Sequence, residues 1–150
     1  MKIKYLLAIL LFFVVACNKG NNGQLSLTIK TVSSNDVAVG EPLQILFDFT
    51  EKSSVIDSIM MMKIRINQKT TETVRDTVGY PVPTYPKNSR GQIRLSLDYN
   101  LDLISAINPP PIDSAHFESD SLILKFVAKD LDNHTSDTVS TGLIVVQRTQ

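Results

Sequence analysis

Apolar and polar residues alternate along most of the chain after Leu25, and this alternation constrains the fold more than any other feature of the sequence. It runs through residues 25–30, 43–50, 60–67, 93–99 and 122–129. A period of two places successive side chains on opposite faces, as in a β-strand that buries one face. Short strands at this spacing, without a long stretch of helical period, predict an all-β domain.

The run of three methionines at Met60–Met62 opens one of the alternating segments. Counted from Met60, the alternation assigns one face to four apolar residues, Met60, Met62, Ile64 and Ile66. We expect this face to lie in the core, and Lys63 and Arg65 on the opposite face to meet solvent. Three methionines also suggest a site for a soft metal such as copper(I), but a deformable core filling is the interpretation that we adopt.

Turn-forming segments separate the strands. Asn35-Asp36 predicts a turn, and the threonine-rich segment Thr71–Val78 predicts an edge strand. Residues 101–107 are expected to form a short helical turn that stops before the three prolines at 109–111. About seven strands result, and we expect them to form a single antiparallel β-sandwich over residues 25–148.

A proline-rich segment follows Gly79, and its prolines exclude a central strand. Its aromatic and proline residues form a candidate binding loop that consists of Tyr80, Pro81, Pro83, Tyr85 and Pro86. Tyrosine is enriched at the energetic centres of protein interfaces. The alternative, which we favour, is an extended connection whose tyrosines cover the edge of the sandwich.

The end of the chain resembles the terminal hairpin of bacterial immunoglobulin-like domains. The resemblance rests on Leu122–Asp130, Ser136–Val139 and Leu143–Val146. An Asp-x-x-Gly-Asn turn often joins these strands in that family; Asp130 matches the aspartate, and Asn133-His134 replaces Gly-Asn. Asparagine tolerates the left-handed backbone conformation that the glycine would supply. The resemblance implies an Ig-like β-sandwich that lacks the tryptophan and the disulfide of antibody domains.

The first residues have a different composition from the rest of the chain. Lys2 and Lys4 precede an apolar run, Tyr5–Ala16, which is shorter than the about 20 residues that a membrane span needs. A basic start, a short apolar centre and a small last residue are the parts of a signal peptide. Val14-Val15-Ala16-Cys17 resembles the lipobox of bacterial envelope lipoproteins. In that family the thiol, here of Cys17, receives a diacylglyceryl group, the chain is cut before it, and acyl chains such as palmitate anchor the protein.

The sequence therefore predicts three parts: a signal peptide (1–16), a lipidated cysteine with a flexible tether (17–24), and the β-sandwich domain (25–148). An ordinary signal peptide and an uncleaved anchor are the alternatives. Asn18 is not the aspartate that the lipoprotein family links to inner-membrane retention, and the acidic cluster of surface-exported members is missing. We expect the lipid on Cys17 to hold the protein in the outer membrane, facing the periplasm.

Charge and cysteine content exclude several classes of function. The chain has 15 basic and 15 acidic residues, and the loss of Lys2 and Lys4 on cleavage leaves a net charge of −2. The chain lacks the excess of basic residues that is typical of nucleic-acid-binding proteins. Cys17 is the only cysteine, so after lipidation no thiol remains for a disulfide, a zinc site or a nucleophile.

Motifs for catalysis and for metal binding are missing as well. Only His116 and His134 could act as general bases near neutral pH. A calcium loop beginning at Asp130 lacks the glycine and the glutamate that an EF-hand requires, although a looser calcium site at this end of the domain is an alternative. We therefore expect no catalytic residues, no metal and no cofactor.

One short pattern occurs more often than composition predicts. An aspartate followed by serine or threonine and then by an apolar residue occurs five times, with hydroxyls at Ser58, Thr77, Ser114, Ser121 and Thr138. The structural interpretation is that aspartate forms a turn and the apolar residue starts a strand. The triad also resembles the acceptor motif for O-glycosylation of exported proteins in some gut and environmental bacteria, which makes these hydroxyls candidate acceptors.

These observations favour a non-catalytic, membrane-anchored envelope lipoprotein whose domain is a binding or assembly module for a protein or glycan partner. Two alternatives come from other classes. A small envelope carbohydrate hydrolase would use paired carboxylates, such as Asp98 and Asp102, roughly 5 to 9.5 Å apart in a cleft. An inhibitor or adaptor would work through the loop from Tyr80 to Tyr85.

Overall fold

The structure, a computed structural model, describes residues 24–67, 69, 75–104, 109–114 and 116–148. Cys17, the signal peptide and the tether up to residue 23 lie outside the described residues. The described chain consists of strands, one short helical turn and the segments that connect them. None of its helical residues form a helix long and apolar enough to cross a membrane. The prediction of an all-β domain is confirmed.

Nine strands are present in the described chain. They are β1 (Leu25–Val32), β2 (Asp36–Val37), β3 (Leu43–Glu51), β4 (Ile56–Arg65), β5 (Arg75–Pro81), β6 (Ser89–Leu97), β7 (Asp120–Asp130), β8 (Val139–Ser140) and β9 (Ile144–Val146). A single π-helical turn, η1 (Tyr99–Leu103), follows β6.

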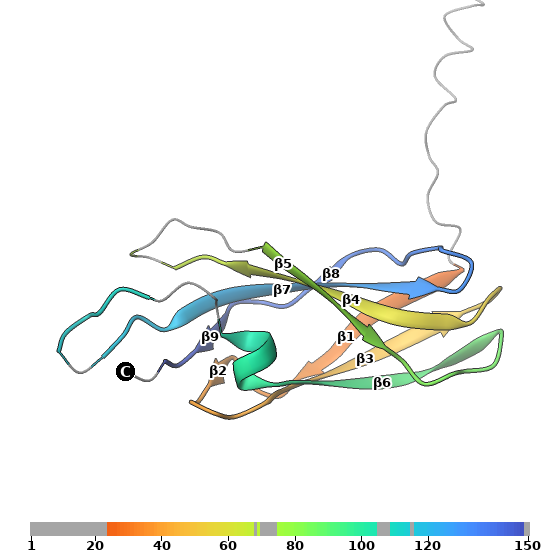
Figure 1. The fold of residues 1–150 in the computed structure, drawn as a ribbon. Helices are drawn as coiled ribbons and strands as arrows, with labels where there is room; N and C mark the ends of the chain where they lie inside the picture. The colour runs from red at the N-terminus through yellow and green to blue at the C-terminus, as the bar shows by residue number, and fades with distance from the viewer. Residues whose placement is uncertain (1–23, 68, 70–74, 105–108, 115, 149–150) are drawn as a thin grey trace, which may run out of the picture.

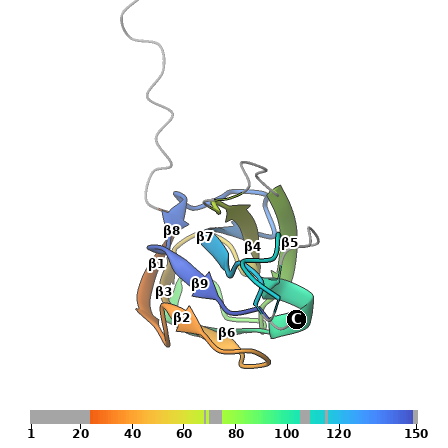
Figure 2. The ribbon, with the colours of Figure 1, turned by 90° about the vertical axis from the view of Figure 1, so that its left-hand side faces the viewer.

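The strands form two sheets. One sheet has three antiparallel strands in the order β1-β3-β6. The other has the order β2-β9-β7-β4-β5, and β8 also pairs with β7. Figure 1 shows the sheets as two stacked layers, and Figure 2 looks along the strands from the end at which β9 finishes. One core is enclosed between the layers.

The inward faces of β3 and β7 supply the centre of this core. Buried side chains alternate along both strands and include Leu43, Ile45, Phe47, Phe49, Leu122, Leu124, Phe126 and Ala128. The rings of Phe47 and Phe126 meet edge to face across the two sheets, with centroids 5.0 Å apart. The faces predicted for these two strands are confirmed.

The prediction for β4 is wrong, because its two faces are exchanged. Ile59 and Met61 are fully buried, whereas Met62 is 38% exposed and Ile66 is 44% exposed. A β-bulge between Ile56 and Ser58 inserts one residue into the pairing with β7 and shifts the alternation. Met60, Met62, Ile64 and Ile66 therefore lie on the outer face of the six-stranded sheet, and Lys63 and Arg65 point inward.

The strand count and one pairing also differ from the prediction. The described chain has nine strands rather than about seven, and β2 pairs with β9 in parallel, so the larger sheet is mixed. β2 begins at Asp36, where a turn was predicted. Strands of two or three residues are too short to produce a recognisable alternation in the sequence.

The structure places two further predicted elements. β5 lies at the edge of the six-stranded sheet, as expected for the threonine-rich segment, whose residues 71–74 lie outside the described chain. The strand continues to Pro81, so Tyr80 and Pro81 belong to β5 and not to the predicted loop. The helical turn occurs at Tyr99–Leu103 rather than at 101–107, and Leu101 is 83% exposed. Residues 105–108 lie outside the described chain.

Candidate interaction surface

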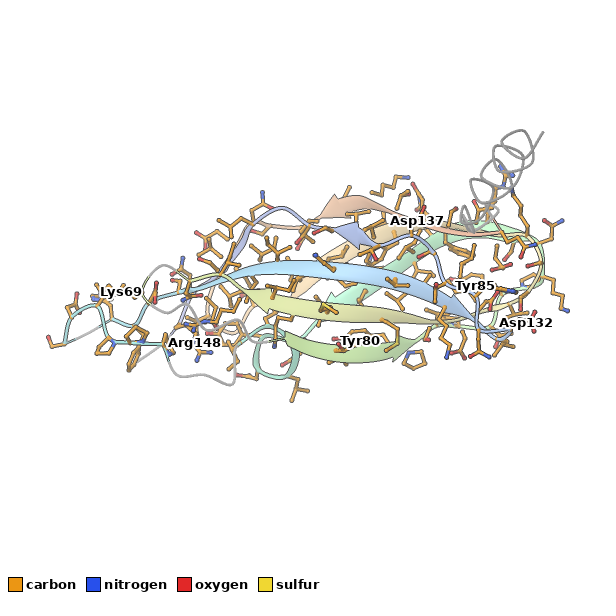
Figure 3. All side chains as sticks on the ribbon, turned by 90° about the horizontal axis from the view of Figure 1, so that it is seen from above. Lys69, Tyr80, Tyr85, Asp132, Asp137 and Arg148 are labelled. Atoms are coloured by element: carbon orange, nitrogen blue, oxygen red, sulfur yellow. The ribbon has the colours of Figure 1, made fainter. Side chains whose placement is uncertain are left out.

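Two tyrosines of the candidate binding loop are half-buried and pack against the core. Tyr80, on β5, donates its hydroxyl to Oδ1 of Asp102 at 2.6 Å. The ring of Tyr85 packs on Phe49 with centroids 4.8 Å apart. Figure 3 shows Tyr80 along β5 and Tyr85 near the opposite end of the molecule from Arg148. These positions agree with tyrosines that cover the sheet edge; Pro81, Pro83 and Pro86 are exposed.

The carboxylates of Asp98 and Asp102 hold the η1 turn. Oδ1 of Asp98 caps the turn by accepting from the backbone N–H groups of Asn100 and Leu101, at 2.8 and 2.9 Å. Oδ2 of Asp102 accepts from the Asp98 N–H at 2.7 Å. On the other side, Nζ of Lys63 donates to the carbonyl of Asp102 at 2.8 Å. The pair considered for hydrolysis is thus engaged with the backbone of the turn.

A buried ion pair lies at the end of the molecule where β4 finishes. Nε of Arg65 is 2.7 Å from Oδ1 of Asp120, and both side chains are fully buried. Nη1 of Arg148 is 3.4 Å from the other carboxylate oxygen of Asp120. Burial raises the pKa of the nearby Tyr99 hydroxyl. This cluster cannot be recognised in the sequence, because residues 65 and 120 belong to different strands and no motif links them.

The turn between β7 and β8 lies at the other end of the molecule. Asp130 is buried, and its two carboxylate oxygens accept from the backbone N–H of His134 at 2.7 Å and contact Nδ1 of His134 at 2.8 Å. This hydrogen bond, aided by the charge of Asp130, raises the pKa of His134 above its ordinary value. Asn133 has a φ of 66°, so the left-handed conformation predicted for this residue is confirmed.

The outer face of the six-stranded sheet has a surface that the sequence analysis did not identify. The registers place Met60 between Gly79 of β5 and Val127 of β7, and Met62 between Thr77 and Lys125. We call this surface the methionine face, and it comprises Met60, Met62, Ile64, Thr77, Gly79, Ile123, Lys125 and Val127. An open hollow of about 370 Å³ lies on it. Figure 3 views the molecule from this side.

The hollow has an apolar lining with one charged group. Met60, Met62 and Val127 line it together with Lys125, and Thr77 and Thr138 also border it. In the described part of the chain, no carboxylate lies within ion-pair distance of Lys125. Met60, which lines the hollow, lies over Gly79, where a Cβ would come within 3.1 Å of Sδ of Met60.

Four of the five candidate glycosylation residues lie on the same side of the molecule as the methionine face. Ser58, Thr77 and Ser121 alternate with inward-facing residues on β4, β5 and β7. Thr138 borders the hollow, and Ser114 is exposed in the segment before β7. Thr77, Ser114 and Thr138 are exposed, whereas Ser58 and Ser121 are half-buried.

Of the two histidines, His116 is exposed and its Nδ1 lies 2.9 Å from Oδ1 of Asp113. Across the residues that the structure describes, no three histidine, cysteine, aspartate or glutamate side chains cluster as ligands of a metal ion would. The absence of a metal and of a cofactor stays a prediction.

The sequence did contain a signal for the methionine face. Ile59 and Met61 are apolar as well as Met60 and Met62, so β4 carries apolar residues on both of its faces.

Comparison with known proteins gives no family for the chain. No protein-family model and no curated protein sequence matches it. Among solved structures, the sporulation control protein Spo0M from Bacillus subtilis has a TM-score of 0.47 and 12% identity, covering 83% of this chain and 50% of that chain. The alkylpurine DNA glycosylase AlkC from Pseudomonas fluorescens, bound to DNA with an abasic site analog, has a TM-score of 0.46 and 5% identity, covering 83% and 31%.

A β-glucosidase from Listeria innocua in complex with gluconolactone gives a TM-score of 0.45 and 11% identity, covering 83% of this chain and 16% of the enzyme. This chain thus spans half or less of the length of each of these structures. At scores this low, the likeness supports no statement about what the chain binds or catalyses.

Proposed function

We propose that the chain is a non-catalytic lipoprotein of the bacterial envelope, in which a lipid on Cys17 tethers one Ig-like β-sandwich that binds or assembles with a protein or glycan partner. The leading placement is the outer membrane, facing the periplasm. The methionine face is the observation that carries the binding role. Half-buried and exposed apolar side chains gather there around an open hollow, and contiguous apolar surface of this kind is typical of interaction sites.

The arrangement of the described carboxylates favours binding over the alternative of a hydrolase. Asp98 and Asp102 accept hydrogen bonds from the backbone of η1, Asp120 pairs with Arg65, and Asp130 holds the His134 turn. Each of these groups has a structural role that explains its position. The adaptor alternative, which depends on Tyr80 and Tyr85, is less favoured because both rings pack against the core.

The anchor is tested by growing cells with an alkyne-tagged fatty acid and comparing the native protein with Cys17→Ser. We expect the native protein to carry the tag and to sediment with membranes, and the variant to lose both properties. The soluble variant should keep its β-sheet circular dichroism spectrum, since Cys17 precedes β1. Tag or membrane retention in a cleaved Cys17→Ser protein would contradict the anchor.

The binding role is tested by crosslinking intact cells that contain the anchored protein, followed by pull-down and mass spectrometry. We expect one envelope protein or glycan to be crosslinked reproducibly, and Lys125→Glu to reduce its yield. A purified protein that cleaves envelope glycans, and loses that activity in Asp102→Asn, would instead establish the hydrolase.

A further inference from the structure

We propose that the methionine face binds a protein segment in which a carboxylate stands between apolar side chains. The inference rests on the proposed function and deepens it, because it names the surface of the domain that makes the contact and the chemistry of the partner. Three features of the methionine face lead to it: its apolar character, its single lysine and the hollow beside Gly79.

The apolar character is best judged against the outer face of the other sheet. That face is polar, and its side chains bind one another: Asp48 accepts from Gln92 at 2.9 Å and lies 3.8 Å from Nζ of Lys30. A sheet with one solvated face normally shows this polar exterior. On the methionine face, Met62 is 38% exposed beside Met60 and Val127. Methionine side chains are flexible and polarisable, which suits them to contact with varied apolar partners.

Lys125 supplies the charge that selects the partner. It is half-buried between Met62 and Ser140 in the register of the sheet, and no described carboxylate lies within ion-pair distance of it. An ammonium group in an apolar setting gains most from a carboxylate, since the interaction of the two charges strengthens when water is displaced. A partner segment with one acidic residue and apolar neighbours complements both parts of the surface.

The position of Lys125 also argues against a second copy of this chain as the occupant. A symmetric pair places the same patch of each copy in contact. Lys125 lies in the middle of the methionine face, between Ile123 and Val127 along β7 and beside Met62 of β4. Two copies meeting through this face would bring their ammonium groups together, which costs free energy in a desolvated contact.

The shape of the hollow depends on Gly79. Its missing side chain leaves Met60 free to lie over β5, and a Cβ would come within 3.1 Å of Sδ of Met60. A bulky side chain at position 79 would displace Met60 and so change the shape of the hollow that Met60 lines. The hollow therefore offers room for one apolar side chain of the bound segment beside the carboxylate that meets Lys125.

The test uses the mature protein in detergent micelles and a displayed library of random peptides. We expect the selected peptides to share an aspartate or glutamate flanked by apolar residues. Lys125→Glu should weaken their binding by about tenfold or more, and exchange of the peptide's acidic residue for lysine should restore binding to this variant. Gly79→Val should weaken binding without changing the charge preference. Arg94→Glu, on the outer face of the other sheet, is the matched control and should bind like the native protein.

Selected peptides without a shared acidic residue, or equal binding by Lys125→Glu, would overturn the proposal. A concentration-dependent dimer that Met62→Lys abolishes would assign the face to a second copy instead. Binding of the Cys17→Ser protein to phospholipid vesicles, lost in Met62→Lys, would assign it to a lipid surface. The selection measures binding to the methionine face, so its failure leaves the lipid anchor untouched. It can be repeated with the Cys17→Ser protein, so failure of the fatty-acid labelling leaves this proposal untouched.

Discussion

Arg65 belongs to a strand that faces solvent on one side, yet its guanidinium lies in the interior against Asp120. Nη1 and Nη2 of Arg65 are buried and make no hydrogen bond within the described part of the chain. Burying such charges is unfavourable unless they are paired, and removal of one partner leaves the other charge buried without compensation. The stability of this end of the molecule therefore depends on both partners.

Asp120→Asn is expected to lower the free energy of unfolding by about 3 to 5 kcal/mol, because it leaves the buried charges of Arg65 and Arg148 without their carboxylate. Chemical denaturation monitored by circular dichroism measures the change. Lys30→Met is the control: it breaks an exposed ion pair of 3.8 Å with Asp48 and should cost less than about 1 kcal/mol. Equal effects of the two substitutions would show that the buried pair is not required for stability.

His134 gives the fold a pH dependence with a defined sign. Its pKa is raised in the folded protein by the hydrogen bond to Asp130, so protonation stabilises the fold. The stabilisation is complete below the unfolded pKa of about 6.5 and is lost as the pH rises through the higher folded pKa. Unfolding measured from about pH 5 to pH 8 should show this loss in the native protein.

His134→Gln should remove that pH-dependent part, whereas His116→Gln, which leaves the Asp130 contact intact, should retain it. Parallel pH profiles for the native protein and His134→Gln would contradict the assignment. Asparagine at position 133 already has the left-handed conformation in the same turn, so neither substitution alters the backbone requirement there.

At the scale of elements, η1 joins the free edges of the two sheets. It follows β6 directly and receives the hydroxyl of Tyr80 from β5 and the ammonium of Lys63 from β4. Figure 2 shows η1 beside these edges. The turn thus closes one side of the core, and the hydrogen bond of Tyr80 connects β5 to it.

Tyr80→Phe should destabilise the domain by about 1.5 to 3 kcal/mol, the range for a hydrogen bond to a charged group. Tyr85→Phe is the matched control, because its hydroxyl makes only a long bond of 3.4 Å to the carbonyl of Gln92, and about 0.5 kcal/mol is expected. Both substitutions keep the aromatic ring and its packing. Thermal unfolding of the two variants, compared at one pH, distinguishes the effects; a larger loss for Tyr85→Phe would refute the role given to η1.

The sequence predicted β3 and β7 with their correct faces because polar residues such as Gln44 and Lys125 mark the outward positions between large apolar ones. It failed for β4 because apolar residues occupy both faces, and the bulge after Ile56 moved the alternation by one residue. The pair of Arg65 and Asp120 joins positions 55 residues apart. No local pattern encodes such a contact, so only the assembled sheet reveals it.

At the scale of the whole molecule, the two ends of the layers differ. Glu51 and Asp130 lie at the end where β1 begins, and Arg65 and Asp120 lie at the end where β9 finishes. The candidate glycosylation residues are distributed over both ends and over the methionine face between them. Their exposure, rather than their motif, should decide which are modified.

If the acceptor motif is used, Thr77, Ser114 and Thr138 should be occupied before Ser58 and Ser121. The first three are exposed, whereas the last two are half-buried and the hydroxyl of Ser58 donates to Oδ2 of Asp57 at 3.0 Å. Glycopeptide mass spectrometry of the native protein measures the occupancy of each residue. Modification of Ser121 alone would contradict the order, and an intact mass explained by lipid alone would remove glycosylation altogether.

The positions of β1 and β9 have a mechanical consequence. β1 begins at one end of the layers, and β9 finishes at the other. A pulling force between these two points runs along the strands and perpendicular to the hydrogen bonds that join them. Such a force loads the bonds of β1 with β3, and of β9 with β7, in shear, so that many must break together. When the domain is held at one end and pulled from the other, we therefore expect it to resist unfolding until many hydrogen bonds break at once, and not to lose its strands one by one.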